Sequence, residues 1–157
     1  MTVIAVYSPA GRIDVDARRS LATSLTDAVL EVECGLVTEV ARLGFQVHFR
    51  QLADDELAIG GVLLADRPVD ALLVDVAVMD GSWPPEARAT AITNVLAALA
   101  RDLRLDEPSS SWWVNFRVID EGSWGAGASV VSMLDLLVPG IFTEARIDEI
   151  RTALDPI

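Results

Sequence analysis

The chain has 157 residues, of which 52% are hydrophobic and 23% are charged, and its formal net charge at pH 7 is −12. This length and composition are typical of one globular domain with its own core, and they exclude a disordered chain. The negative charge argues against nucleic acid and anionic membranes as partners, and no apolar run approaches the roughly 20 residues that cross a bilayer. We therefore expect one cytoplasmic domain, residues 1–157, that binds neither nucleic acid nor a membrane.

The first half of the chain predicts a strand, a helix and a second strand. The first strand begins at Thr2 and ends before the turn Gly11-Arg12. Asp14 suits the N-cap of a helix that runs to about Cys34, because apolar side chains recur there at helical spacing. The unit is completed by an alternating strand, FQVHFRQL (45–52), and a Gly-rich corner, LAIGG (57–61).

The second half repeats this order. An apolar strand, ALLVDVAVM (71–79), leads into a turn at Gly81 and a helix whose first turn contains Pro84 and Pro85. Proline suits that position because no intrahelical hydrogen bond is lost there. The strand WWVNFRVI (112–119) and the corner SWGAGA (123–128) follow. We therefore predict an internal repeat of residues 1–61 and 71–128, with a C-terminal extension at 129–157.

Two such units side by side define the fold class. A strand–helix–strand connection is normally parallel and right-handed. The sequence thus predicts an α/β (α+β) fold with a four-stranded mixed sheet and two helices on one face. Much of the other sheet face is apolar, as is the segment VVSMLDLLVPGI (130–141), and uncovered apolar surface usually marks an interface. We expect an oligomer that closes the sheets against one another; a ferredoxin-like dimer is the alternative architecture.

Residue types that bind metals or act as nucleophiles are scarce. Cys34, the only cysteine, is interpreted as a small buried hydrophobic residue. His48, the only histidine, has no second His or Cys at ligand spacing, so we expect no metal site. All twelve basic residues are arginines, so a bound anion must be held by guanidinium, backbone N–H groups or the chain's own amino terminus.

The early strand, the Gly11-Arg12 turn, the helix spacing and the corner LAIGG together resemble the tautomerase superfamily. The doubled unit resembles its fused members, such as malonate semialdehyde decarboxylase and the chloroacrylate dehalogenases, over roughly residues 1–138. The resemblance implies a homotrimer, a small acidic or carbonyl substrate and cofactor-independent isomerase-type chemistry. It also implies that an N-terminal proline is the catalytic group, and Thr2 occupies that position here.

Candidate site residues follow from the same resemblance. Thr2 and Arg12 are the candidate catalytic residues, Arg12 matching the family's arginine after the first strand. Gln46 stands where a second substrate arginine lies in the family, and Trp113 is its counterpart in the second unit. Trp124, a further substrate-binding candidate, keeps the family's aromatic residue at the corner. Arg117 is a candidate on strand alternation alone, because it shares one side of a strand with Trp113; this side could line a pocket or face solvent or a neighbouring subunit.

Each candidate also has a structural interpretation. Removal of Met1 would give Thr2 a primary α-amine with an unperturbed pKa of about 7.7–8.0, but Thr2 also has the β-propensity of an ordinary strand residue. Arg12 could hold an anion or form a surface ion pair, and the tryptophans suit core or interface packing. The alternatives to an isomerase are therefore a non-catalytic homologue that has lost the proline and a ferredoxin-like ligand-binding dimer.

Overall fold

The computed structural model describes residues 1–138 and 140–154. None of the helices in these two ranges is both long and apolar enough to span a membrane. The strands are β1 (Thr2–Pro9), β2 (Phe45–Leu52), β3 (Ala58–Ile59), β4 (Val62–Leu63), β5 (Leu72–Met79), β6 (Trp112–Ile119), β7 (Gly125–Ala126) and β8 (Ser129–Val130). The helices are α1 (Val15–Cys34), α2 (Glu39–Arg42), α3 (Pro85–Asp102), the 3-10 turn η1 (Leu134–Leu136) and α4 (Glu144–Leu154).

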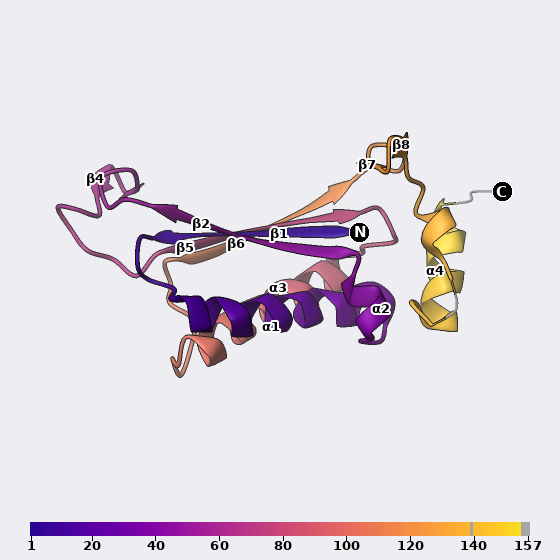
Figure 1. The fold of residues 1–157 in the computed structure, drawn as a ribbon, viewed down its shortest axis with the longest axis horizontal. Helices are drawn as coiled ribbons and strands as arrows, with labels where there is room; N and C mark the ends of the chain where they lie inside the picture. Colours follow the sequence, from indigo (N-terminus) through magenta and orange to yellow (C-terminus); the bar gives the residue numbers. More distant parts are fainter. Residues whose placement is uncertain (139, 155–157) are drawn as a thin grey trace.

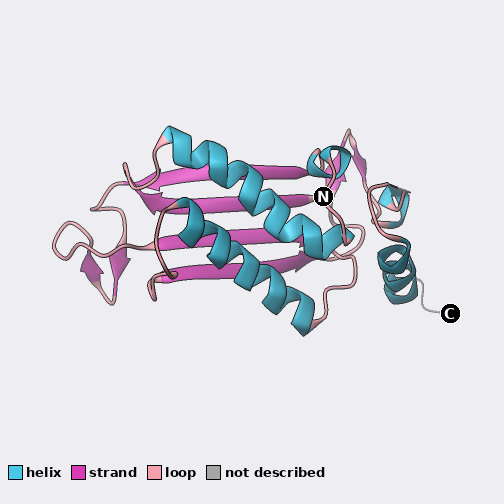
Figure 2. Cartoon of the chain, turned by 90° about the horizontal axis from the view of Figure 1, so that it is seen from below, coloured by secondary structure: helices cyan, strands magenta, loops and turns pink. Residues whose placement is uncertain are grey.

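The main sheet has the strand order β2-β1-β5-β6. β1 and β2 are parallel, as are β5 and β6, whereas the two central strands β1 and β5 are antiparallel. Two β-α-β units therefore meet at their first strands. Figure 2 shows α1 and α3 lying across one face of this sheet. The predicted mixed four-stranded sheet with two helices on one face is confirmed.

Local sequence explains where both long helices begin. The side chain of Asp14 accepts a hydrogen bond from the backbone N–H of Ala17, which is the N-cap interaction expected of it. Pro84 is the N-cap of α3 and Pro85 its first residue. α1 ends at Cys34, and Gly35 is its C-cap, with a φ of 74° in the left-handed conformation that favours glycine at a helix C-terminus.

Alternate residues of each strand build the core. Ile4 and Val6 of β1 and Val74 and Val76 of β5 are at most 1% exposed and pack against the helices. Their neighbours in sequence point to the opposite face of the sheet, because side chains alternate along a strand. That opposite face is only partly covered within one chain, and we call it the open face.

Because β1 and β5 run in opposite directions, equivalent parts of the two units lie at opposite ends of the sheet. The turn after β5 reaches the start of β1, where the backbone N–H of Met79 donates to the carbonyl of Met1. The β3–β4 and β7–β8 hairpins accordingly lie at opposite ends (Figure 1). We call the end that holds Met1 the N-terminal end, and the other the Arg12 end.

The C-terminal extension packs against the N-terminal end only. Met133, Leu137, Phe142 and Ile150 are at most 8% exposed and form a second core cluster with Cys34 and neighbouring residues. Figure 1 shows α4 beside this end of the sheet. The apolar segment 130–141 is therefore in part an intrachain core, which corrects its use as a sign of an interface. Residues 139 and 155–157 of the predicted extension lie outside the described residues.

Candidate functional site

The N-terminal end of β1 holds a buried polar cluster. Thr2 is 1% exposed, and its hydroxyl donates a hydrogen bond of 2.7 Å to Oε2 of Glu33. The backbone nitrogen of Met1 lies 3.5 Å from Oε1 of the same carboxylate. The backbone N–H of Thr2 donates to the carbonyl of Gly44 at 2.9 Å. One carboxylate thus contacts both of the first two residues.

Sequence reasoning missed Glu33, although its position carries a signal. Glu33 is 2% exposed and lies three or four residues after Val29 and Leu30, which are fully buried on the same side of α1. A carboxylate at such a position needs polar partners, because burying an unpaired charge is strongly unfavourable. Met1 and Thr2 supply those partners, so α1 and β1 are joined at this point.

A cavity of about 310 Å³ adjoins this cluster. The C-terminal extension contributes one wall of it, through residues of η1 and of the segment before α4. Glu33 and Asp135 are its charged side chains, and no Arg or His from the described residues lines it. Its apolar lining includes Met1, Phe45, Leu136, Val138, Ile141 and Phe142.

Cys34 also lines this cavity but is not a nucleophile. The thiol is 3% exposed, and its burial, together with the negative charge of Glu33, raises its pKa to about 12. Only the thiolate is a strong nucleophile, and at neutral pH this thiol is protonated. Its interpretation as a buried hydrophobic residue is confirmed.

Arg12 lies at the opposite end of β1. Its Nε and Nη2 atoms donate to the two carboxylate oxygens of Asp70 at 2.5 and 2.9 Å. The hydrogen bond to Asp70 raises the pKa of the guanidinium, which also lies 6.0 Å from the ring centre of Trp112. The seven steps from Thr2 to the end of β1 span roughly 23 Å. The structure therefore does not bring Thr2 and Arg12 together within one chain.

The other predicted site residues divide between the same two ends. Gln46 and Arg117 are exposed on the open face near the N-terminal end, aligned across the sheet through Val3 and Ala77. Trp113 is 65% exposed on the same face, toward the Arg12 end. Trp124 is half-buried in the cluster formed by the C-terminal extension. Only Trp124 shares the packing environment of Met1.

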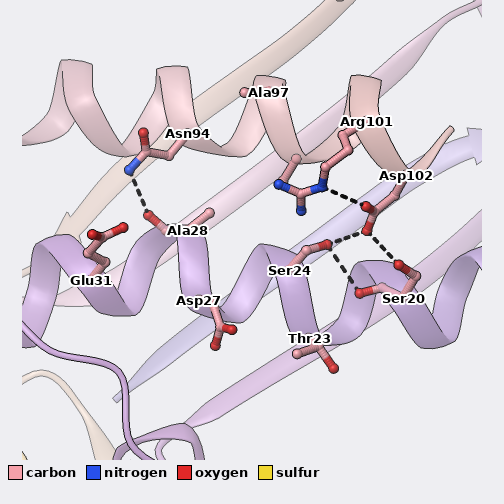
Figure 3. Close-up of a pocket in the computed structure, with 11 residues that line it drawn as sticks. Ser20, Thr23, Ser24, Asp27, Ala28, Glu31, Asn94, Ala97, Arg101 and Asp102 are labelled. Carbon is pink, nitrogen blue, oxygen red and sulfur yellow. Dashed lines mark hydrogen bonds and ion pairs between the residues drawn. The ribbon is translucent and has the colours of Figure 1, made fainter. Parts of the chain in front are cut away.

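A further cavity, of about 730 Å³, is a polar groove between α1 and α3 (Figure 3). Ser20 and Ser24 donate hydrogen bonds to Asp102, which Arg101 also contacts. Because these polar groups satisfy one another, the groove is best explained as the contact between the two units. Within residues 1–138 and 140–154, no group of three or more His, Cys, Asp or Glu side chains is arranged to hold a metal ion.

No family model and no curated protein matches the sequence, but solved structures match the fold. A member of the cis-3-chloroacrylic acid dehalogenase family is 20% identical with a TM-score of 0.66, covering 82% of each chain. A wild-type fused 4-OT in a symmetric trimer is 18% identical with a TM-score of 0.67, covering 87% of this chain and 99% of its own. Pt0534 inactivated by 2-oxo-3-pentynoate is 14% identical with a TM-score of 0.68 over the same shares. The chain therefore has the fused double β-α-β fold of the tautomerase superfamily.

Proposed function

We propose that this chain is a cofactor-independent isomerase-type protein that acts on a small carbonyl or carboxylate compound at the N-terminal end of β1. The observation that carries the proposal is the cavity of about 310 Å³ beside a buried carboxylate that contacts both of the first two residues. The fold supports it, because the structural neighbours include fused 4-OT and dehalogenase-family proteins.

The proposed catalytic group is the α-amine of Thr2 after removal of Met1. Met1 lines the cavity, so its removal would both enlarge the cavity and uncover Thr2. Glu33 already accepts the Thr2 hydroxyl and lies 3.5 Å from the Met1 nitrogen, which shows that it can pair with an ammonium group at this end. In this proposal the ammonium form of the Thr2 amine, paired with the carboxylate of Glu33, acts as the proton donor.

The chemistry that this pair supports is ketonisation of an enol. The ammonium group transfers its proton to the enol carbon, the enol hydroxyl transfers its proton to Glu33, and a new carbonyl forms. Proton transfer from Glu33 to the neutral amine restores the starting state. Such positioned acid–base pairs typically contribute 10²–10⁴-fold to a rate.

Arg12 enters this proposal through a second copy of the chain. In one copy Thr2 lies at the start of β1 and Arg12 in the turn beyond its other end, and the strand itself spans roughly 23 Å. An arginine that holds the substrate of a given Thr2 therefore belongs to a neighbouring copy. The assembly proposed is a homotrimer, as in the fused 4-OT neighbours whose solved structures are trimers. A mass of three chains in light scattering supports it, and a monomer contradicts it.

The test is ketonisation of enolised phenylpyruvate, followed by absorbance, with protein whose N-terminus has been defined by intact mass. We expect activity that rises in Thr2→Pro and falls at least tenfold in Glu33→Gln. Glu31→Gln, an exposed position on the same helix, is the matched control and should keep full activity. Retention of Met1 in active protein, or inactivity of protein lacking Met1, contradicts the proposal.

The second candidate is a non-catalytic binding protein of the same fold. Two observations favour it: Thr2 is 1% exposed, and Arg12 already has a bidentate carboxylate partner in Asp70. This candidate predicts that native protein binds small carbonyl compounds but turns none over, whereas Thr2→Pro gains activity.

A further inference from the structure

Two residues of the second unit hold the side chain of Arg12 in one orientation. The Nε and Nη2 atoms of Arg12 donate to the two carboxylate oxygens of Asp70, which lies two residues before β5. The Cζ atom of Arg12 lies over the ring of Trp112, 6.0 Å from the ring centre. Trp112 is 5% exposed and belongs to the main core, so its ring is itself fixed. A planar guanidinium that is held along one edge and over one face has little freedom to rotate.

The hydrogen bonds to Asp70 leave most donors of this guanidinium unused. A guanidinium carries five N–H groups, one on Nε and two on each Nη atom. Asp70 accepts from Nε and from one N–H of Nη2, and within residues 1–138 and 140–154 nothing accepts from Nη1. The edge formed by Nη1 and Nη2 can therefore bind a second carboxylate through two parallel hydrogen bonds. Such a carboxylate need not displace Asp70.

The ion pair does not enclose Arg12. The side chain of Arg12 is 26% exposed. It lines a cavity of about 410 Å³ together with Asp70, and also a cavity of about 590 Å³ to which Asp70 does not contribute. Arg12 is thus accessible from a direction in which Asp70 does not lie.

We propose that Asp70 is a positioning residue, which orients Arg12 so that its Nη1–Nη2 edge binds the carboxylate of a substrate held in the site of a neighbouring copy. The inference rests on the proposed function, in which Arg12 of one chain serves the Thr2 of another. A free arginine side chain loses rotamer freedom when it binds a ligand, and orientation in advance removes that cost.

Asp70 also has an opposing effect, because its negative charge repels an acid bound to the same guanidinium. The side chain of Asp70 is 35% exposed, and water weakens the interaction between charges that it reaches. The orientation of Arg12 therefore outweighs the repulsion, and loss of Asp70 weakens the binding of an acid. A carboxylate that merely competed with the substrate would have the opposite effect, so the sign of the change distinguishes the two roles.

The test is calorimetric titration of the full chain, its N-terminus defined by intact mass, with phenylpyruvate at pH 7. Asp70→Asn replaces one accepting oxygen by an N–H donor and should weaken binding at least fivefold. Asp70→Glu keeps the carboxylate and should bind within twofold of the native protein. Asp66→Asn is the matched control, because it makes the same change at an exposed residue of the same connection between β4 and β5. The control should also bind within twofold of the native protein.

An uncharged ligand separates the orientation of Arg12 from a general loss of structure. Methyl phenylpyruvate differs from phenylpyruvate mainly in that its acid group carries no charge, so Asp70→Asn should change its affinity less than twofold. In active protein the same variant should raise KM for enolised phenylpyruvate and leave kcat within twofold. This split is expected because Arg12 holds the carboxylate equally in the ground state and the transition state.

Tighter binding of phenylpyruvate by Asp70→Asn would overturn the inference, because Asp70 would then compete with the ligand. Equal losses for the acid and the ester, native affinity in Asp70→Asn or Arg12→Ala, no binding by the native protein, or dissociation of the Asp70→Asn assembly in light scattering would also overturn it. An inert protein that shows the expected losses supports the inference while contradicting the proposed isomerase. An active protein in which Asp70→Asn binds phenylpyruvate as the native protein does has the reverse meaning.

Discussion

The two ends of β1 receive equivalent parts of the two repeated units, yet they differ in burial. Each end has one turn between a strand and a helix and one small hairpin. At the N-terminal end the C-terminal extension covers the turn, and Glu33 is 2% exposed. At the Arg12 end no such segment is found among the residues that the structure describes, and the side chains of Arg12 and Asp70 remain 26% and 35% exposed. The two repeated units therefore do not have the same surroundings, because the C-terminal extension buries side chains at the N-terminal end alone.

The largest expected effect comes from removing the buried carboxylate. Glu33→Ala leaves the Thr2 hydroxyl and the adjacent amine without an acceptor, and breaking a buried ion pair typically costs about 3–5 kcal/mol. We expect a loss of about 3 kcal/mol in the free energy of unfolding, measured by urea denaturation. Glu31→Ala on the exposed side of α1 should change it by less than about 0.5 kcal/mol. Equal effects of the two variants would show that Glu33 is not a buried partner.

The second largest loss of stability is expected from removing Arg146, which anchors the C-terminal extension. Arg146 is 13% exposed and donates to the carbonyls of Glu33, Gly81 and Ser82. Hydrogen bonds from a charged donor contribute about 1.5–3 kcal/mol, so Arg146→Ala should destabilise the protein by about 2 kcal/mol. It should also speed alkylation of Cys34, which the extension covers. Arg151→Ala, an exposed position on α4, should do neither; protection of Cys34 in Arg146→Ala would contradict this role.

Comparing Gly35→Ala with Gly11→Ala separates the effect of the contact between α1 and the extension from the effect of backbone strain. Gly35 and Gly11 have φ values of 74° and 76°, so alanine is strained at both positions, by about 1–2 kcal/mol. At Gly35 an added Cβ would also lie 2.7 Å from Oγ1 of Thr143, whereas nothing lies within 4 Å at Gly11. Thermal unfolding should therefore show Gly35→Ala to be the more damaging by about 1 kcal/mol. Equal losses would mean that Thr143 moves aside freely.

The smallest loss of stability is expected from breaking the ion pair between Arg12 and Asp70 at the Arg12 end. Asp70→Asn removes a charge from a pair that is partly exposed to water, and such pairs contribute about 0–1 kcal/mol. We expect at most about 0.5 kcal/mol of destabilisation in urea at low salt, and less at 1 M salt because ions screen the pair. A loss near that of Glu33→Ala would remove the contrast between the two ends.

The repeat and the sheet could be predicted because local rules and the fold agree there. Alternation in β2 and β6, the Asp14 cap and the prolines before α3 each specify their element without long-range information. α2 and α4 were not predicted as helices. The extension has no counterpart in the first unit, so its packing against Cys34 and Met79 could not be inferred from the repeat.

The site could be predicted only in part, because its contacts join residues far apart in sequence. The first strand and its turn identified Thr2 and Arg12 as candidates. The pairing of Arg12 with Asp70 could not be predicted, because the two residues are 58 positions apart and meet through the antiparallel register of β1 and β5. The contact of Thr2 with Glu33 likewise depends on how α1 crosses the sheet. Glu33 lies four residues after the buried Val29, and this spacing indicates a buried carboxylate. The many acidic residues of the chain made this one hard to single out.

The most direct test of the account is a two-dimensional amide NMR titration of the full chain with phenylpyruvate. It reports which residues surround the ligand without requiring turnover. The account predicts shifts at Thr2, Glu33, Phe45 and Phe142, and at Arg12 where a neighbouring copy supplies it, with the amides of Ser24 and Asn94 in the groove between α1 and α3 unchanged. Shifts confined to Arg12 and Asp70, or no shifts at ligand concentrations in the millimolar range, would contradict it.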